Sequence, residues 1–162
     1  MKVDENPVIL VAEDDVGHYE LIKRNLWRSC VDNEILYFKD GQEILNFLFK
    51  TGSEQIRKDN TPYVLLLDIR MPKVDGREVL KKIKSDDKLK NIPVIMLTTT
   101  DNASEIENCY NLGCNFYMVK PVDYNKFMAN VENMGAFLSS CGVRVPPTKD
   151  FDLQREKGTQ TL

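Results

Sequence analysis

The sequence is poor in long apolar runs and carries no surplus of basic charge. The longest apolar runs, such as residues 64–67, end after a few residues, whereas a helix that crosses a bilayer needs about 20. Residues 1–6 are polar and acidic, and no apolar signal-peptide core follows them. We therefore expect a cytoplasmic protein with no membrane partner. The net charge of −3 also argues against a nucleic-acid-binding surface, which is usually basic.

Cysteine and histidine are too scarce and too scattered for a metal site built on sulfur or imidazole. The four cysteines lack the paired spacing of a zinc site; they are Cys30, Cys109, Cys114 and Cys141. We expect reduced and mostly buried thiols at these positions. The single histidine, His18, falls in a predicted helix, where we expect an ordinary side chain that faces solvent or is partly packed.

Five short apolar runs punctuate the first 120 residues. They are residues 8–12, 35–38, 63–67, 94–97 and 116–119. Three of the runs are continuously apolar, which is typical of parallel strands covered by helices on both faces. Amphipathic stretches separate the runs, so strands and helices alternate. This order predicts an α/β fold, a doubly wound parallel sheet of five strands with five helices.

Local signals support the predicted helices. Tyr19, Ile22 and Leu26 recur at spacings that place them on one helix face. Asp40 followed by Glu43 indicates a capping box that opens the second helix.

Later segments set the expected boundaries of the domain. Leu112 and Gly113 form a helix stop, and apolar positions over residues 127–138 indicate a last helix. Residues 51–62 are polar and predict an enlarged surface loop. Residues 146–162 lack a core pattern. We expect one domain over residues 1–145, followed by a mobile polar tail.

Polar side chains follow the predicted strands at their carboxyl ends. They are Glu13, Asp14, Asp68, Thr98 and Lys120. In an open parallel sheet these ends share one edge, where ligands bind. Converging carboxylates suit a hard cation such as Mg²⁺. A cation, a lysine and a hydroxyl around a nucleophilic aspartate are equipment for phosphoryl transfer.

The motifs at these strand ends resemble the response-regulator receiver family. They are Glu13-Asp14-Asp15, residues 66–76 (LLDIRMPKVDG), residues 97–99 (LTT) and residues 119–121 (VKP). The resemblance covers about residues 8–140. It implies a flavodoxin-like, CheY-like sheet with strand order 2-1-3-4-5. The long loop before the third strand and the LTTT segment are most similar to stand-alone receivers that serve phytochrome-type sensor histidine kinases.

The resemblance implies a metal site and a phosphoacceptor. Asp68 would accept the phosphoryl group. Asp14, Asp68 and the backbone carbonyl of Arg70 would bind Mg²⁺ directly, while Glu13 would act mainly through a bound water. Asp15 is expected first as a helix N-cap.

The resemblance also implies a switch. Thr98 would hydrogen-bond a phosphoryl oxygen, and Lys120 would pair first with Asp68 and then with the phosphoryl group. Tyr117 would be the aromatic residue that turns inward when Thr98 moves. The bond between Lys120 and Pro121 would be cis, as X-Pro bonds can be at modest cost.

These expectations describe a phosphorylation-operated signalling switch rather than an enzyme. A sensor histidine kinase would donate the phosphoryl group, and output would follow through protein–protein contact. A homodimer through the face of the fourth helix, fifth strand and fifth helix is a further hypothesis. His18 would not be a phosphotransfer histidine, because that group belongs to the kinase.

Three alternatives remain open. A degenerate receiver would bind partners without phosphorylation, but Asp14, Asp68, Thr98 and Lys120 are all present. An aspartyl-phosphate phosphatase would need a second aspartate where Arg70 stands. A flavodoxin-like cofactor carrier would need a phosphate-binding loop after the first strand, where carboxylates stand instead.

Overall fold

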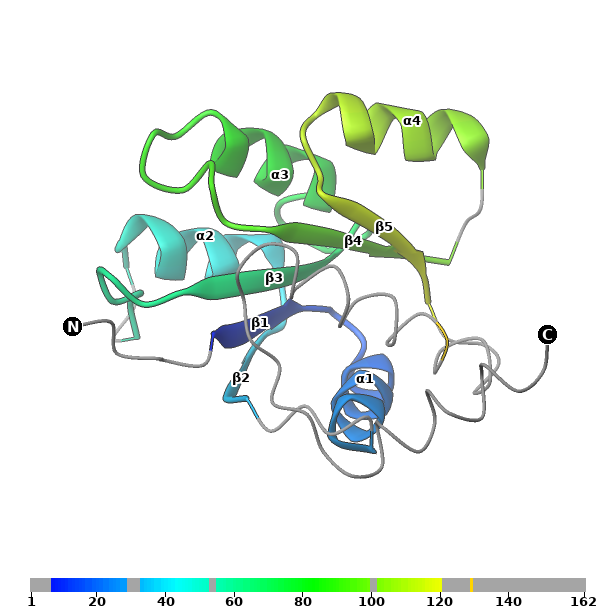
Figure 1. Ribbon diagram of the computed structural model, residues 1–162, viewed down its shortest axis with the longest axis horizontal. Helices are drawn as coiled ribbons and strands as arrows, with labels where there is room; N and C mark the ends of the chain where they lie inside the picture. The colour runs from blue at the N-terminus through cyan, green and yellow to red at the C-terminus, as the bar shows by residue number, and fades with distance from the viewer. Residues whose placement is uncertain (1–6, 29–32, 53–54, 100–101, 121–128, 130–162) are drawn as a thin grey trace, which may run out of the picture.

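The protein folds around one parallel sheet, seen in a computed structural model that describes residues 7–28, 33–52, 55–99, 102–120 and 129. The strands are β1 (Val8–Ala12), β2 (Ile35–Phe38), β3 (Tyr63–Asp68), β4 (Val94–Thr98) and β5 (Phe116–Val119). The helices are α1 (Val16–Arg28), α2 (Gly41–Phe49), α3 (Gly76–Lys84) and α4 (Ala103–Asn111). Strands and helices alternate along the described chain (Figure 1).

The sheet has the order β2-β1-β3-β4-β5, as the resemblance implied, and every neighbouring pair is parallel. β1 and β3 are central and almost wholly buried. The chain therefore reverses its direction of winding beside β1, and the carboxyl ends of β1 and β3 lie next to each other. Ligands bind at this kind of switch point in open α/β sheets.

Helices cover both faces of the sheet. In Figure 1, α2, α3 and α4 lie on one side and α1 lies on the other. Alternate residues of each strand divide between the two apolar layers, since successive side chains point to opposite faces. Leu65 and Leu67 pack on the α2–α4 side, while Val64 and Leu66 pack with Ile22 of α1. The continuous apolar runs in the sequence reflect this burial on both faces.

The helix signals hold, with one difference in the capping box of α2. Asp40 caps α2 by accepting a hydrogen bond from the backbone N–H of Glu43. The Glu43 carboxylate returns to the N–H of Lys39, one residue before the position that a capping box requires. Gly113 follows α4 with a φ of 101°, in the region that glycine adopts at low cost. Tyr19, on the predicted face of α1, is buried.

The expected fifth helix, the tail over residues 146–162 and the peptide bond to Pro121 lie outside the described residues. Among the described helices, none has the length and apolar character needed to cross a bilayer.

Candidate functional site

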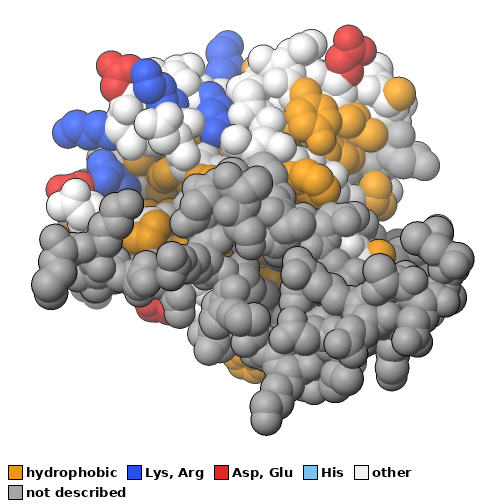
Figure 2. All heavy atoms as spheres, in the orientation of Figure 1, with side chains coloured by type: hydrophobic (Ala, Val, Ile, Leu, Met, Phe, Trp, Pro, Cys, Tyr) orange, Lys and Arg blue, Asp and Glu red, His pale blue; other side chains and the backbone are white. Residues whose placement is uncertain are grey.

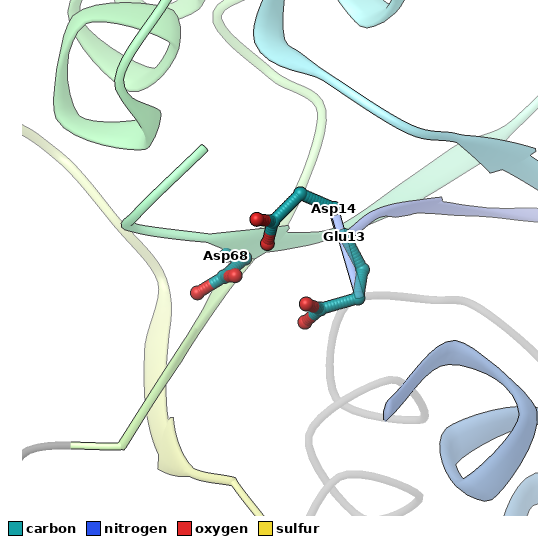
Figure 3. Close-up of side chains that lie close together, drawn as sticks. All are labelled: Glu13, Asp14 and Asp68. Atoms are coloured by element: carbon teal, nitrogen blue, oxygen red, sulfur yellow. The ribbon is translucent and has the colours of Figure 1, made fainter. Parts of the chain in front are cut away.

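Three carboxylates meet at the carboxyl ends of β1 and β3. Asp68 is the last residue of β3, and Glu13 and Asp14 follow β1 directly. One oxygen from each side chain lies within 4.8 Å of the others, and Figure 3 shows the three side chains close together. Glu13 and Asp68 are buried, whereas Asp14 is exposed. The set therefore offers oxygen ligands to a hard divalent cation with one side open to solvent.

Lys120 balances part of this negative charge from the end of β5. Its Nζ lies 2.9 Å from Asp68 Oδ2. It also lies 2.8 Å from Glu13 Oε2 and 3.0 Å from Oε1, and only Oε1 has hydrogen-bond geometry. The backbone N–H of Lys120 donates to the carbonyl oxygen of Thr98, which aligns the ends of β4 and β5. Lys120 is only 7% exposed, so little water screens these ion pairs.

The ionisable groups of this cluster shift one another's pKa values. Burial raises the pKa of Glu13 from 4.5 to about 7; the hydrogen bond from Lys120 opposes this rise, and the nearby charge of Asp68 adds to it. Burial also raises the pKa of Asp68 against the hydrogen bond from Lys120. Burial acts to lower the pKa of Lys120, but its bonds to both carboxylates outweigh burial and raise it. The site without a metal thus holds more negative charge than its lysine stabilises.

Thr98 and Tyr117 lie together on the neighbouring strands β4 and β5. Thr98 is the last residue of β4 and is 4% exposed. Burial raises the pKa of Tyr117, and a side-chain hydrogen bond with Thr98 acts in the opposite direction. A movement of the Thr98 side chain would therefore change the hydrogen bond that it shares with Tyr117.

The connection after β3 passes close beneath Asp68. The N–H of Gly76 donates to the carbonyl oxygen of Ile69, and a Cβ on Gly76 would overlap the backbone carbonyl of Asp68. Glycine is required here by this close approach rather than by its φ angle. Arg70 lies in the same connection with an exposed side chain, which lines a polar hollow together with Asn102.

His18 is a member of the cluster that the sequence did not reveal. Asp15 caps α1, as expected, by accepting the backbone N–H of His18 at 3.0 Å. This turn brings His18 Nδ1 to 3.2 Å from Lys120 Nζ and 3.7 Å from Glu13 Oε1. The imidazole is partly exposed, as predicted, but it contacts the site. Its position four residues after Asp14, in the first turn of α1, was the available signal.

The structure thus brings together Glu13, Asp14, Asp68 and Lys120, and it pairs Thr98 with Tyr117 at the same edge of the sheet.

Comparisons with known proteins agree with this fold. A family described as the response regulator receiver domain matches residues 9–132. The response regulator Rcp1 of Synechocystis sp. is 34% identical over 139 residues, which are 85% of this chain and 93% of Rcp1.

Solved structures extend the likeness. The Mn²⁺-bound form of Rcp1 has a TM-score of 0.71 at 34% identity, covering 87% of this chain and 99% of that one. The phosphorylated cyanobacterial phytochrome response regulator RcpA has a TM-score of 0.73 at 34% identity, covering 88% and 99%.

Receiver domains of this family are phosphoacceptors and not enzymes of the usual kind. The match spans most of the chain, and one solved relative is described as a phytochrome response regulator. The chain belongs to the response regulator receiver domain family and is a switch of two-component signalling.

Proposed function

We propose that this receiver accepts a phosphoryl group on Asp68 in a reaction that depends on Mg²⁺. The observation that carries the proposal is the Asp68 carboxylate, which is buried beside two further carboxylates and held at 2.9 Å by Lys120. Asp68 Oδ would attack the phosphorus of a phosphohistidine, and the imidazole would leave. The relatives support this assignment, since one of them is described as phosphorylated.

A divalent cation fits the residues present. The raised pKa values of Glu13 and Asp68 mark negative charge that burial leaves unstabilised, and a cation would relieve it. Asp14, Asp68 and the backbone carbonyl of Arg70 would hold Mg²⁺, with Glu13 acting through a bound water. The metal would neutralise charge on the transferred group. Rcp1 has been described with Mn²⁺, which supports a divalent ion at this edge.

The change of shape would begin at Thr98. A phosphoryl group on Asp68 would attract the Thr98 hydroxyl and also Lys120, whose ammonium would then share its hydrogen bonds with phosphoryl oxygens. The hydrogen bond between Thr98 and Tyr117 would break or re-form, and Tyr117 would turn. A change of charge at the end of β3 would thus cause a change of conformation at the surface of β5.

The donor would be a sensor histidine kinase of the phytochrome type, since one solved relative is described as a phytochrome response regulator. Output would use protein–protein contact on the face of α4 and β5. Tyr110 is 47% exposed and Val119 is 36% exposed there. Figure 2 shows hydrophobic side chains gathered on this part of the visible surface. A second copy of the chain is the proposed partner on that face.

Intact-mass measurement tests the proposal. The purified protein is incubated with acetyl phosphate, with and without Mg²⁺, beside Asp68→Asn and the matched control Asp75→Asn. We expect one added phosphoryl group only with Mg²⁺, in the wild type and in Asp75→Asn, and none in Asp68→Asn. A purified phytochrome-type kinase replaces acetyl phosphate in a second series. If neither donor adds a phosphoryl group, the chain is instead a receiver that binds partners without phosphorylation.

Light scattering tests the dimer. The mass of the phosphorylated protein should be twice that of the monomer, and Tyr110→Glu should return it to the monomer. A monomer in both phosphorylation states would remove the dimer while leaving the phosphoacceptor assignment intact.

A further inference from the structure

The ammonium of Lys120 has three acceptors, and one of them is outside the family's acidic cluster. An ammonium carries three N–H donors. Two of them point to Asp68 Oδ2 and Glu13 Oε1, and the third faces His18 Nδ1 at 3.2 Å. The buried Lys120 is therefore fully hydrogen-bonded by side chains from the ends of β1 and β3 and from α1.

The direction of the contact with His18 follows from the chemistry of the two groups. An ammonium has no lone pair and can only donate. The contact therefore needs the tautomer of His18 that accepts at Nδ1 and carries its proton on Nε2. The backbone N–H of His18 donates to Asp15 Oδ1, which fixes the start of α1 and with it the backbone of His18. Among the described residues, the candidate metal cluster contains three carboxylates and not this imidazole.

We infer that His18 is a positioning residue, which holds the Lys120 ammonium in place for phosphoryl transfer to Asp68. The two carboxylates pull Nζ toward the metal side of the site, whereas His18 anchors it from the α1 side. The anchor keeps one N–H engaged while the other two exchange between carboxylate and phosphoryl oxygens. Without it, the ammonium spends less time in the geometry that stabilises the transferring group. This inference rests on the proposed phosphoacceptor function of Asp68.

The transfer itself leaves the protons of this pair unchanged. With acetyl phosphate as the donor, an Asp68 oxygen bonds to phosphorus while the bond from phosphorus to the acetyl oxygen breaks. Acetate leaves with the electron pair of that bond. Lys120 and His18 supply hydrogen bonds and position, and neither gives up a proton.

Substitutions separate the acceptor atom from the bulk of the ring. His18→Leu keeps comparable volume without an acceptor, whereas His18→Asn places Oδ1 at the position of Nδ1. Glu20→Leu, on an exposed position of the same helix, is the control for an added apolar side chain. Phosphorylation by acetyl phosphate at saturating Mg²⁺ is followed by intact mass, calorimetry measures the affinity for Mg²⁺, and thermal unfolding checks each fold.

We expect His18→Leu to be phosphorylated roughly 3- to 10-fold more slowly, the effect of one partly solvated hydrogen bond to a charged group. His18→Asn should recover a rate close to that of the wild type. Glu20→Leu should match the wild type, and all variants should bind Mg²⁺ with equal affinity. Equal rates for His18→Leu and the wild type would overturn the inference, as would a loss that His18→Asn fails to recover.

The contact has its own spectroscopic test, because the chain contains one histidine. A sample labelled with ¹⁵N-histidine reports this ring alone. At mildly alkaline pH, where imidazole is neutral, Nδ1 should show the signal of a hydrogen-bonded acceptor. Lys120→Met should move that signal toward the position of a free ring nitrogen, whereas Lys23→Met on the same helix should not. An unchanged signal in Lys120→Met would refute the contact.

The proposed function and the role of His18 can be refuted independently. A wild-type protein that no donor phosphorylates would refute the proposed function, while the ¹⁵N measurement would still decide whether His18 holds Lys120.

Discussion

Glu13 should make the metal-free protein less stable as the pH rises. The side chain is fully buried next to Asp68, and its pKa is raised from 4.5 to about 7 by burial, with the charge of Asp68 adding to the effect and the hydrogen bond from Lys120 opposing it. Replacing Glu13 by glutamine removes the titration but keeps the shape and an acceptor for Lys120. The comparison of Glu13→Gln with the wild type therefore isolates the free energy of ionising this one carboxyl group.

The sign and the size follow from linkage. A carboxyl group whose pKa is higher in the folded state than in the unfolded state binds protons more tightly when folded. Its contribution to stability is fully present below pH 4.5 and is lost as the pH rises through about 7. At 1.36 kcal/mol per pKa unit, the loss is at most roughly 3 kcal/mol. Asp68, whose pKa is also raised, adds a loss of the same sign to both proteins.

Urea unfolding of the two metal-free proteins across this pH range measures the effect. We expect the free energy of unfolding of the wild type, relative to Glu13→Gln, to fall as the pH rises and to level off above 7. Glu20→Gln, at an exposed position of α1, controls for the loss of one acidic charge. Saturating Mg²⁺ should remove most of the slope, since a cation stabilises the ionised form. A difference that is flat, or that rises with pH, would refute this account of the site.

Three further predictions concern the stability of the site and of the fold that holds it. Lys120→Met should destabilise the metal-free protein at pH 8 by about 3–5 kcal/mol, the cost of leaving buried carboxylates without their partner; urea unfolding should show a smaller cost at pH 5, below the raised pKa of Glu13 of about 7. Gly76→Ala should cost about 1–3 kcal/mol, because its Cβ would overlap the Asp68 carbonyl; a thermal midpoint equal to that of the wild type would expose an error. Lys84→Met should lower the free energy of unfolding by about 1–3 kcal/mol, because three oxygen acceptors lose their ammonium donor; an unchanged urea midpoint would contradict it.

The fold could be predicted from the sequence because its strands are buried on both faces. Runs such as residues 63–67 stand out as continuously apolar, and the observed strands differ from the predicted ranges by one residue at most. The differences are Asp68 and Thr98, which end β3 and β4 instead of following them. The N–H of Ile69 donates to the Leu97 carbonyl and extends the ladder past the last apolar residues. Apolar patterning cannot detect a polar residue that stays in the strand.

The candidate site was predictable to the extent that it depends on strand ends. Glu13, Asp68 and Lys120 are far apart in the sequence, yet the order of the strands alone requires them to share an edge. His18 was not predictable in this way. Its contact with Lys120 depends on the rotation of α1, which the Asp15 cap and the packing of the opposite helix face set together. A period of 3.6 residues identifies the buried face of a helix, but it does not identify which exposed residue contacts the site.

The balance of charge explains why the site needs so many different partners. Three carboxylates and one ammonium leave a formal charge of about −2. A divalent cation cancels that charge, and the site is then close to neutral. On the proposed function, a phosphoryl group on Asp68 would return the site to a net negative charge, because the modified side chain carries about one more charge than the carboxylate. Neither the metal nor Lys120 can supply more charge, so neutral donors such as the Thr98 hydroxyl must stabilise the remainder. Thr98 would therefore move toward the phosphoryl group, and this movement would link the local change of charge to the movement of Tyr117.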